Sequence, residues 1–512
     1  MTVHRLTLGD VLREHRRSRP TGTAAVDGPL RLSYTELDDR VNRLANALAA
    51  AGVGRGDRVC YIGRNSVRLQ EGLLAAGRLG AVFVPANWRQ SADELAFVLS
   101  DLAPAAVLWQ SEGIGEAVRA ARGAAPEAAE ARWVHCATAA RETGADEYEG
   151  FLAAAPAEDP DGDGDGSLPV LGLYTAAFDG RPSCALLSSD ALLAHSATLL
   201  WLRRIEPGFT FLNSGPLFHV GTVMFNLAAL HAGGTNVYLP AFDAAEAARL
   251  IEAERVDHIF GFGPMLDAIA EAAGGHDLSS LHFTAHSPEW DARITVGTDP
   301  WNASGMGGYG QTEVGGMLTF LALGMGGAGG AGRPSPMVQV RIAGPDGGEL
   351  PPGETGEITA RGRTLFSGYH GRPELNRRKA AGGWHRTGDL GRREPDGTIT
   401  FIGPRLRMIK TGNENVYPAE VERALRAHPE IADAAVIGVP DERWGQSVTA
   451  VVQREPGAAL DAEAVIGHAR SLLASYKKPR RVVFVEAVPR AGRLPDYAAL
   501  DAEHGGGGYP GE

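Results

Sequence analysis

The stretch KTGNENVYPAEVE, residues 410–422, marks the start of a small domain near the end of the chain. Pro418 suits the first turn of a helix, where a missing N–H costs nothing, so a helix is predicted over 418–428. Two apolar segments, 432–440 and 447–454, follow it and are predicted strands. This order of elements is typical of a small α+β unit.

The domain boundaries follow from this stretch. A basic segment before it predicts a hinge at 403–408, with the small α+β domain at 409–504. The glycine-rich end, 505–512, is predicted to be a disordered tail. The remaining residues, 1–402, are predicted to form one large N-terminal domain.

The large domain has the pattern of an α/β layered sheet. Leu37, Val41, Leu44 and Leu48 recur at helical spacing, and Gly52 is a suitable C-cap. Helical and apolar segments then alternate, which favours sheets covered by helices. The first predicted elements are a helix at 34–53, a strand at 54–63, a helix at 68–79 and a strand at 81–86.

Composition excludes several classes of protein. The formal net charge is −13, with no basic stripe to offset it, which argues against nucleic-acid binding. Cys60, Cys136 and Cys184 are too few and too widely spaced for a disulfide framework, so a reducing cytoplasm is expected. The N-terminus has no apolar core of a signal peptide, and the apolar stretch 220–232 is too short to span a bilayer.

Lysine is scarce, and familiar catalytic motifs are missing. Only Lys379, Lys410, Lys477 and Lys478 occur, so any chemistry that needs an ammonium has four candidates. The chain has no GxxxxGK[ST], GxSxG or HExxH motif, and its GxGxxG matches lack a strand–helix context. P-loop, α/β-hydrolase, zincin and dinucleotide-binding interpretations are therefore disfavoured.

Three strings carry a family resemblance: YGQTE at 309–313, GWHRTGDLGR at 383–392 and KTGNENVYPAEVE at 410–422. In this order and spacing they resemble the adenylate-forming superfamily of acyl-CoA synthetases, adenylation domains and luciferases, and its acyl-CoA ligase branch. The resemblance extends from SYTELDDRVNRLANAL at 33–48 onward. It implies a large adenylate-binding domain and a small C-terminal domain that moves on the hinge.

The resemblance implies a nucleotide site. Asp389 would accept the ribose hydroxyls, and its carboxylate suits that role. Thr312 would offer a hydroxyl to the phosphate, and Tyr309 an aromatic face near the adenine. Glu313 resembles the family's magnesium-ligating glutamate. The same site is expected to include Gly308, Gly310 and Gln311, with Ala285, His286 and Ser287 where the family has an adenine-contacting loop.

The resemblance also assigns residues to thiol transfer. His219 matches a residue beside the carboxylate pocket. Lys410, Gly412 and Glu414 match a loop that reaches the site when the small domain rotates, and Asn413 replaces a usual glycine of that loop. Asn is the next best residue where φ is positive. The family's ribose-contacting arginine would align with Pro404, and a one-residue shift gives the role to Arg405.

The phosphate-binding loop departs from the family. The family pattern is roughly YTSGTTGxPKG, whereas residues 174–184 read YTAAFDGRPSC. Small hydroxyl residues are lost, Asp179 adds a negative charge, and Ser183 replaces the lysine. Each lost charge-assisted hydrogen bond is worth about 1.5–3 kcal/mol. We therefore expect weak binding of a triphosphate.

A second departure lies near the end of the chain. The family closes with a motif like PRxxxGKxxR, whose lysine stabilises charge during adenylation, whereas this chain reads PRAGRLPDY. One alignment places Leu494 at the lysine and another places Arg493 there. Losing one such donor costs on the order of 100- to 1000-fold in rate.

Both departures concern the reaction of ATP with an acid, and the thiol-transfer residues remain. We therefore expect an acyl-CoA ligase-like enzyme that takes preformed acyl-AMP from a separate adenylating enzyme and transfers the acyl group to coenzyme A. ATP is not expected to be an efficient substrate. The need for Mg²⁺ stays open, because Glu313 is then either a relic or a residue that positions Thr312. Non-adenylating ligases of the platensimycin type, in antibiotic biosynthesis, are similar in this respect.

Three alternatives remain. The chain is a complete ATP-dependent acyl-CoA synthetase with a degenerate loop, in which Arg493 replaces the lysine. It is a non-catalytic acyl-ligand binding protein. Or it passes the acyl group to another nucleophile, such as an amine.

Overall fold

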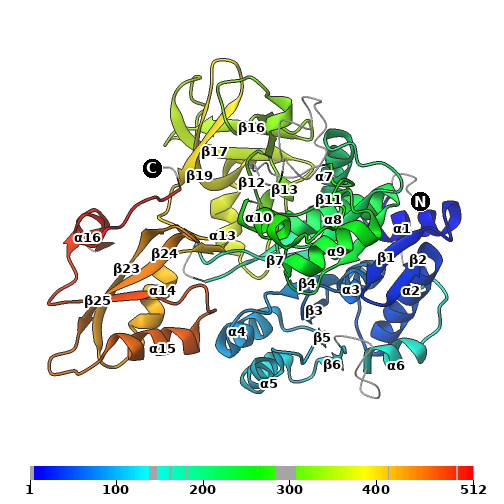
Figure 1. Ribbon diagram of the computed structural model, residues 1–512, viewed down its shortest axis with the longest axis horizontal. Helices are drawn as coiled ribbons and strands as arrows, with labels where there is room; N and C mark the ends of the chain where they lie inside the picture. The colour runs from blue at the N-terminus through cyan, green and yellow to red at the C-terminus, as the bar shows by residue number, and fades with distance from the viewer. Residues whose placement is uncertain are drawn as a thin grey trace.

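The fold consists of a large N-terminal domain and a small C-terminal domain, seen at the right and the left of Figure 1. The computed structural model describes residues 5–137, 147–160, 164–178, 181–261, 263–282, 290, 307–412, 414–491 and 494–510. No helix within these ranges is both long enough and apolar enough to span a membrane.

Two sheets with parallel cores form the body of the large domain. In the described residues the first sheet has the strand order β11-β9-β10-β1-β2, and the second has the order β18-β8-β7-β4-β3-β5-β6. The strands of the first are β1 Thr23–Asp27, β2 Leu30–Ser33, β9 Thr210–Asn213, β10 Thr235–Tyr238 and β11 His258–Ile259. Those of the second are β3 Arg58–Ile62, β4 Val82–Ala86, β5 Ala106–Trp109, β6 Arg132–His135, β7 Pro169–Tyr174, β8 Cys184–Ser188 and β18 Gly368–Tyr369.

Helices pack against these sheets. The predicted helix at 34–53 is α2, and its inward side chains Leu37, Val41, Leu44 and Leu48 are fully buried. Ser33 and Glu36 form a capping box that fixes its start. The α-helices in the described part of this domain are α1 Leu8–Ser18, α2 Tyr34–Ala50, α3 Val67–Arg78, α4 Ala92–Leu102, α5 Gly115–Ala124, α6 Glu147–Ala153, α7 Ser189–Leu202, α8 Val220–Ala232, α9 Ala244–Glu254, α10 Gly263–Ala272 and α13 Pro373–Lys379.

An antiparallel sheet completes the large domain, at the top of Figure 1. Its order is β16-β17-β19-β20, and β19 carries the string around Asp389. Short ribbons after Gly308 connect it to the rest of the domain. The elements are β12 Gly310–Gln311, β13 Gly316–Met317, β14 Thr319–Phe320, β15 Arg333–Pro334, β16 Val338–Ala343, β17 Thr355–Gly362, β19 His385–Arg393 and β20 Ile399–Pro404.

The small domain is a sheet with helices packed against it, as the sequence predicts. The described strands follow the order β22-β21-β24-β23, and β25 pairs in parallel with β24. Its elements are β21 Ile409–Thr411, β22 Glu414–Val416, α14 Pro418–Leu425, β23 Ile431–Asp441, β24 Gly445–Arg454, α15 Ala462–Leu472, β25 Arg481–Val485, β26 Arg490–Ala491, β27 Leu494–Pro495 and α16 Tyr497–His504. The predicted fold class is confirmed.

The chain end differs from the expected disordered tail. Residues 505–510 pack against the small domain, and Tyr509 is only 6% exposed. The Tyr509 hydroxyl accepts a hydrogen bond from Gly438 N at 2.8 Å, and its ring lies 3.7 Å from the Arg407 guanidinium. One buried aromatic side chain is enough to anchor the glycine-rich segment, which composition alone does not reveal.

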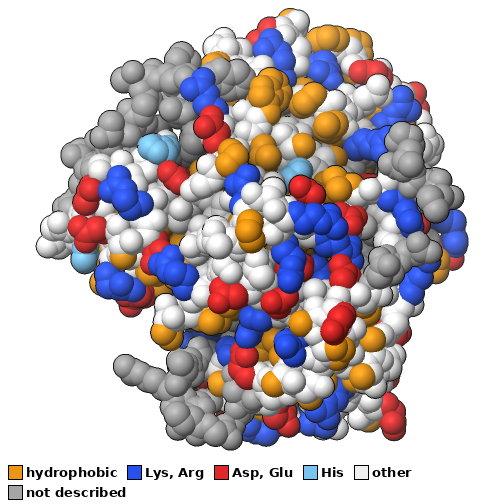
Figure 2. All heavy atoms as spheres, turned by 90° about the vertical axis from the view of Figure 1, so that its right-hand side faces the viewer, with side chains coloured by type: hydrophobic (Ala, Val, Ile, Leu, Met, Phe, Trp, Pro, Cys, Tyr) orange, Lys and Arg blue, Asp and Glu red, His pale blue; other side chains and the backbone are white. Residues whose placement is uncertain are grey.

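Charges of both signs are mixed on the visible surface. Figure 2 shows the face at the right of Figure 1, where Lys and Arg side chains alternate with Asp and Glu. Arg31 with Glu254 and Arg249 with Glu246 are ion pairs of this kind, at 2.7 and 2.6 Å. This face therefore lacks the continuous basic stripe that nucleic-acid binding requires.

Candidate functional site

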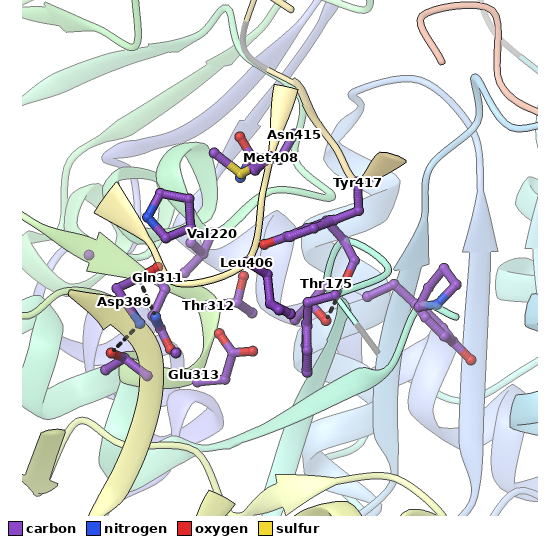
Figure 3. Close-up of a pocket in the computed structure, with 18 of the residues that line it drawn as sticks. Thr175, Val220, Gln311, Thr312, Glu313, Asp389, Leu406, Met408, Asn415 and Tyr417 are labelled. Carbon is purple, nitrogen blue, oxygen red and sulfur yellow. Dashed lines mark hydrogen bonds between the residues drawn. The ribbon is translucent and has the colours of Figure 1, made fainter. Parts of the chain in front are cut away.

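A cleft of about 1030 Å³ lies between the two domains. The large domain lines it with the YGQTE string, Asp389 and the loop after β7, and the small domain with the hairpin of β21 and β22. Figure 3 shows Thr312, Glu313 and Asp389 facing Met408, Asn415 and Tyr417 across this space. The predicted site residues that line it are His219, Gly308, Tyr309, Gly310, Gln311, Thr312, Glu313, Asp389, Arg405, Lys410 and Glu414.

Asp389 is held rigidly by a hydrogen-bond network. The Tyr309 hydroxyl donates to Asp389 Oδ2 at 2.5 Å, and Gln311 Nε2 donates to the same oxygen at 3.2 Å. Burial lowers the pKa of His385 to about 3, so the neutral ring donates from Nε2 to Gln311 Oε1 at 3.1 Å. Burial also raises the pKa of Asp389. The network presents a fixed carboxylate that can accept ligand hydroxyls.

Gly308 and Gly310 allow a close approach of backbone segments. A Cβ on Gly310 would lie 2.1 Å from Gly316 O, and a Cβ on Gly308 would lie 2.2 Å from Thr319 O. Any side chain there would push the YGQTE segment away from its ribbons. Tyr309 is stacked on Phe401, with ring centroids 5.0 Å apart and planes at 19°. No sequence motif singles out Phe401. Its only signal is its place on β20, the strand that pairs with β19 and the string around Asp389.

The Glu313 carboxylate is buried rather than exposed to solvent. It is 6% exposed and accepts a hydrogen bond from the Tyr369 hydroxyl at 2.8 Å. Burial raises its pKa. In the described part of the chain no group of three or more His, Cys, Asp or Glu is arranged to hold a metal. Glu313 thus fits Mg²⁺ only as a single protein ligand beside phosphate oxygens.

The small-domain hairpin brings Glu414 next to His219 and Arg89 of the large domain. Glu414 lies 3.4 Å from His219 Nε2 and accepts a hydrogen bond from Arg89 Nη1 at 3.2 Å. Burial raises the pKa of Glu414, but His219, Arg89 and Lys477 lower it by more, so the carboxylate stays ionised. Arg89, which the sequence did not single out, contacts the hairpin from the large domain.

Lys410 and Gly412 belong to the same hairpin. Burial lowers the pKa of Lys410, whose Nζ donates to Asn415 Oδ1 at 3.0 Å. Gly412 has φ of 58°, in the left-handed region, and its N donates to Trp444 O at 2.7 Å. Gly412 therefore shapes the turn instead of lining the cleft.

A buried ion cluster joins the two domains. Lys477 Nζ donates to Glu94 Oε1 of α4 at 2.7 Å and to Glu420 Oε1 of α14 at 2.8 Å. Ser91 Oγ donates to Leu472 O at 2.9 Å across the same interface. Lys477 is 5% exposed, and no sequence motif indicates a role for it. These contacts hold the hairpin in the cleft.

The wall at the degenerate loop is largely apolar. Ala176, Phe178 and Pro182 line it, and Phe178 packs against Tyr369 with ring centroids 6.0 Å apart. Ser183 is only 2% exposed. Lys379 lines the same wall, although its sequence position matches no adenylation lysine.

Two further predicted residues lie at the edge of the site or outside it. Arg405 lines the cleft but its side chain is 62% exposed, 3.8 Å from Glu357. Leu494 lies on β27 and is 67% exposed. Ala285, His286, Ser287, Asn413 and Arg493, together with Asp179, lie outside the described residues.

Comparisons with known proteins agree with this geometry. The family model "AMP-binding enzyme" matches residues 12–370, and "AMP-binding enzyme C-terminal domain" matches 420–493. Feruloyl-CoA synthase of Amycolatopsis sp is 36% identical over 93% of this chain and 94% of its own. Indoleacetate–CoA ligase of Aromatoleum aromaticum is 35% identical over 92% of each. The amide bond synthetase McbA of Marinactinospora thermotolerans has a TM-score of 0.80 at 25% identity, over 98% and 100% of the chains.

Proposed function

The chain belongs to the AMP-binding enzyme family, and we propose that it transfers the acyl group of a preformed acyl adenylate to coenzyme A. The names of its relatives support the coarser activity, acyl-CoA ligation. We further propose that adenylation is lost and that a separate enzyme supplies the acyl adenylate. The observation that carries this proposal is the apolar lining at Ala176 and Phe178, in the same cleft as the predicted transfer residues His219, Lys410 and Glu414.

The transfer step needs few groups. The thiol of coenzyme A attacks the acyl carbon, the C–S bond forms, the C–O bond to phosphate breaks, and AMP leaves. The mixed anhydride is already activated, so positioning and oxyanion stabilisation supply most of the rate. Helix α8 begins at Val220 in the cleft, and its N-terminus carries partial positive charge. His219, beside Glu414, is placed to receive the thiol proton.

Adenylation needs donors that the substituted residues in the described part of the loop do not offer. A triphosphate requires donors around its β- and γ-phosphates. Ala176 and Phe178 supply no side-chain donor, and the Ser183 side chain is buried. In this pose Leu494 is exposed outside the cleft lining.

The purified protein is expected to form acyl-CoA from acyl-AMP and coenzyme A without ATP, and to show little pyrophosphate exchange with ATP, Mg²⁺ and an acid. Feruloyl and indoleacetyl adenylates are the first acyl adenylates to test, because relatives are named for these acids. Each matching free acid is the control. Pyrophosphate exchange as fast as thioester formation would contradict the loss of adenylation, and no thioester from any adenylate would leave only a binding role.

Leu494→Lys alone is expected to raise pyrophosphate exchange less than ten-fold, because the apolar wall still lacks the phosphate donors. The lysine would restore one charge, worth about 1.5–3 kcal/mol in a formed contact. The comparison is with the double variant Leu494→Lys, Ser183→Lys. Recovery of more than 100-fold by the single variant would favour the complete synthetase.

Two alternative functions have specific support. A complete ATP-dependent synthetase is favoured by the relatives named as CoA synthase and CoA ligase. Transfer to an amine is favoured by the similarity to an amide bond synthetase. Replacing coenzyme A by primary amines in the acyl-AMP assay separates the second from the proposal.

A further inference from the structure

Lys379 brings an ammonium group into the cleft at the wall where the family's loop lysine is missing. It is the last residue of α13. Its Nζ lies 4.8 Å from the centroid of the Phe178 ring and donates to Thr387 O at 3.3 Å. A Cβ on Gly388 would lie 3.2 Å from Nζ, so the glycine next to Asp389 leaves space around the ammonium.

The charge of Lys379 is not balanced by an ion pair. Among the described residues no carboxylate lies within 4.0 Å of its ammonium, and the one hydrogen bond goes to a carbonyl. The neighbouring Arg386 differs, because its Nε donates to Glu357 at 2.8 Å. The ammonium therefore keeps donors that a ligand in the cleft can use.

Burial affects the same group. It lowers the pKa of Lys379, and Glu313, Glu357 and Asp389 offset part of this effect. Those carboxylates do not reach contact distance, so they do not occupy the hydrogen bonds of the ammonium. A phosphate oxygen is the ligand that would use those donors.

We propose that Lys379 is the phosphate-binding cation of this cleft, contacting the phosphate of the bound adenylate. The proposal rests on the proposed function, since it takes an acyl adenylate as the ligand. It gives α13 a phosphate-binding group at the wall where the family pattern has a loop lysine and this chain has Ser183. The Phe178 ring of that loop lies within cation–π distance of this ammonium.

The test is the affinity for AMP compared with adenosine, measured by calorimetry on the full chain. Lys379→Met, which keeps the stem, is expected to weaken AMP about ten-fold and leave adenosine unchanged. Lys379→Arg should retain most of the affinity for AMP. Arg377→Met is the matched control, because Arg377 is exposed on the same helix and pairs with Glu374. Equal affinities for AMP in Lys379→Met and the wild type would overturn the proposal.

Titrations with two further ligands identify which phosphate group the ammonium contacts. ATP and inorganic pyrophosphate are titrated into the same variants. If the variant loses affinity only for ATP and pyrophosphate, the ammonium contacts the pyrophosphate leaving group. That result would overturn its assignment to the adenylate phosphate. Because binding is measured without turnover, this result is independent of the pyrophosphate-exchange test, and either proposal can fail alone.

Discussion

Replacing Lys477 by methionine is expected to slow thioester formation about 100-fold or more while leaving the affinity of the large domain for AMP unchanged. The ammonium is buried between Glu94 and Glu420, at 2.7 and 2.8 Å. Removing it leaves two buried carboxylates without their cation, which costs about 3–5 kcal/mol. The cost falls on the pose in which the hairpin enters the cleft, because Glu94 belongs to the large domain. Stopped-flow measurement of acyl-CoA formation from acyl-AMP checks the rate.

Electrostatics supports a strong effect. Burial lowers the pKa of Lys477, but Tyr476, Glu420 and Glu94 raise it by more, so the lysine is charged at neutral pH. Glu94→Gln isolates the contact between domains, since Lys477 keeps Glu420, and should slow the reaction less than Lys477→Met. Asp93→Asn is the control, because Asp93 is an exposed carboxylate on the same turn of α4. If Glu94→Gln behaves like Asp93→Asn, the cluster stabilises only the small domain.

The features that could be predicted are encoded locally. The capping box of Ser33 and Glu36 and the inward residues of α2 lie within one segment, so the sequence alone places the helix. The strands β3 and β4 follow from short apolar runs. The YGQTE string and Asp389 were expected at one site, and the cleft brings them together.

The features that were missed depend on distant parts of the chain. Lys477 and Glu94 are 383 positions apart, and Arg89 and Glu414 are 325 apart. No local pattern marks these residues, because their partners are set by how the two domains meet. The sequence position of Lys379 matches neither adenylation lysine of the family, yet α13 places its ammonium at the same wall. Alignment locates motifs, but a charged side chain on an element outside those motifs can also reach the site.

Asp389→Ala is expected to reduce kcat/KM for acyl-AMP about 100-fold. The carboxylate would accept two ribose hydroxyls, and a hydrogen bond to a charged group is worth about 1.5–3 kcal/mol. Asp389 also accepts from Tyr309 and Gln311, so its loss disturbs the network around the YGQTE string. Tyr309→Phe separates these effects, because it removes one donor to Asp389 and keeps the carboxylate. We expect it to cost less than ten-fold.

A change in the ligand tests whether the carboxylate contacts the ribose itself. The wild-type enzyme should use an acyl 2′-deoxyadenylate about ten-fold less well than the ribonucleotide, because one hydroxyl is gone. In Asp389→Ala the deoxy substitution should cost nothing further, since the acceptor for that hydroxyl is already absent. Such non-additivity is the signature of a direct contact. If both enzymes lose the same factor on the deoxy ligand, Asp389 supports the Tyr309–Gln311 network without touching the sugar, and the nucleotide lies elsewhere in the cleft.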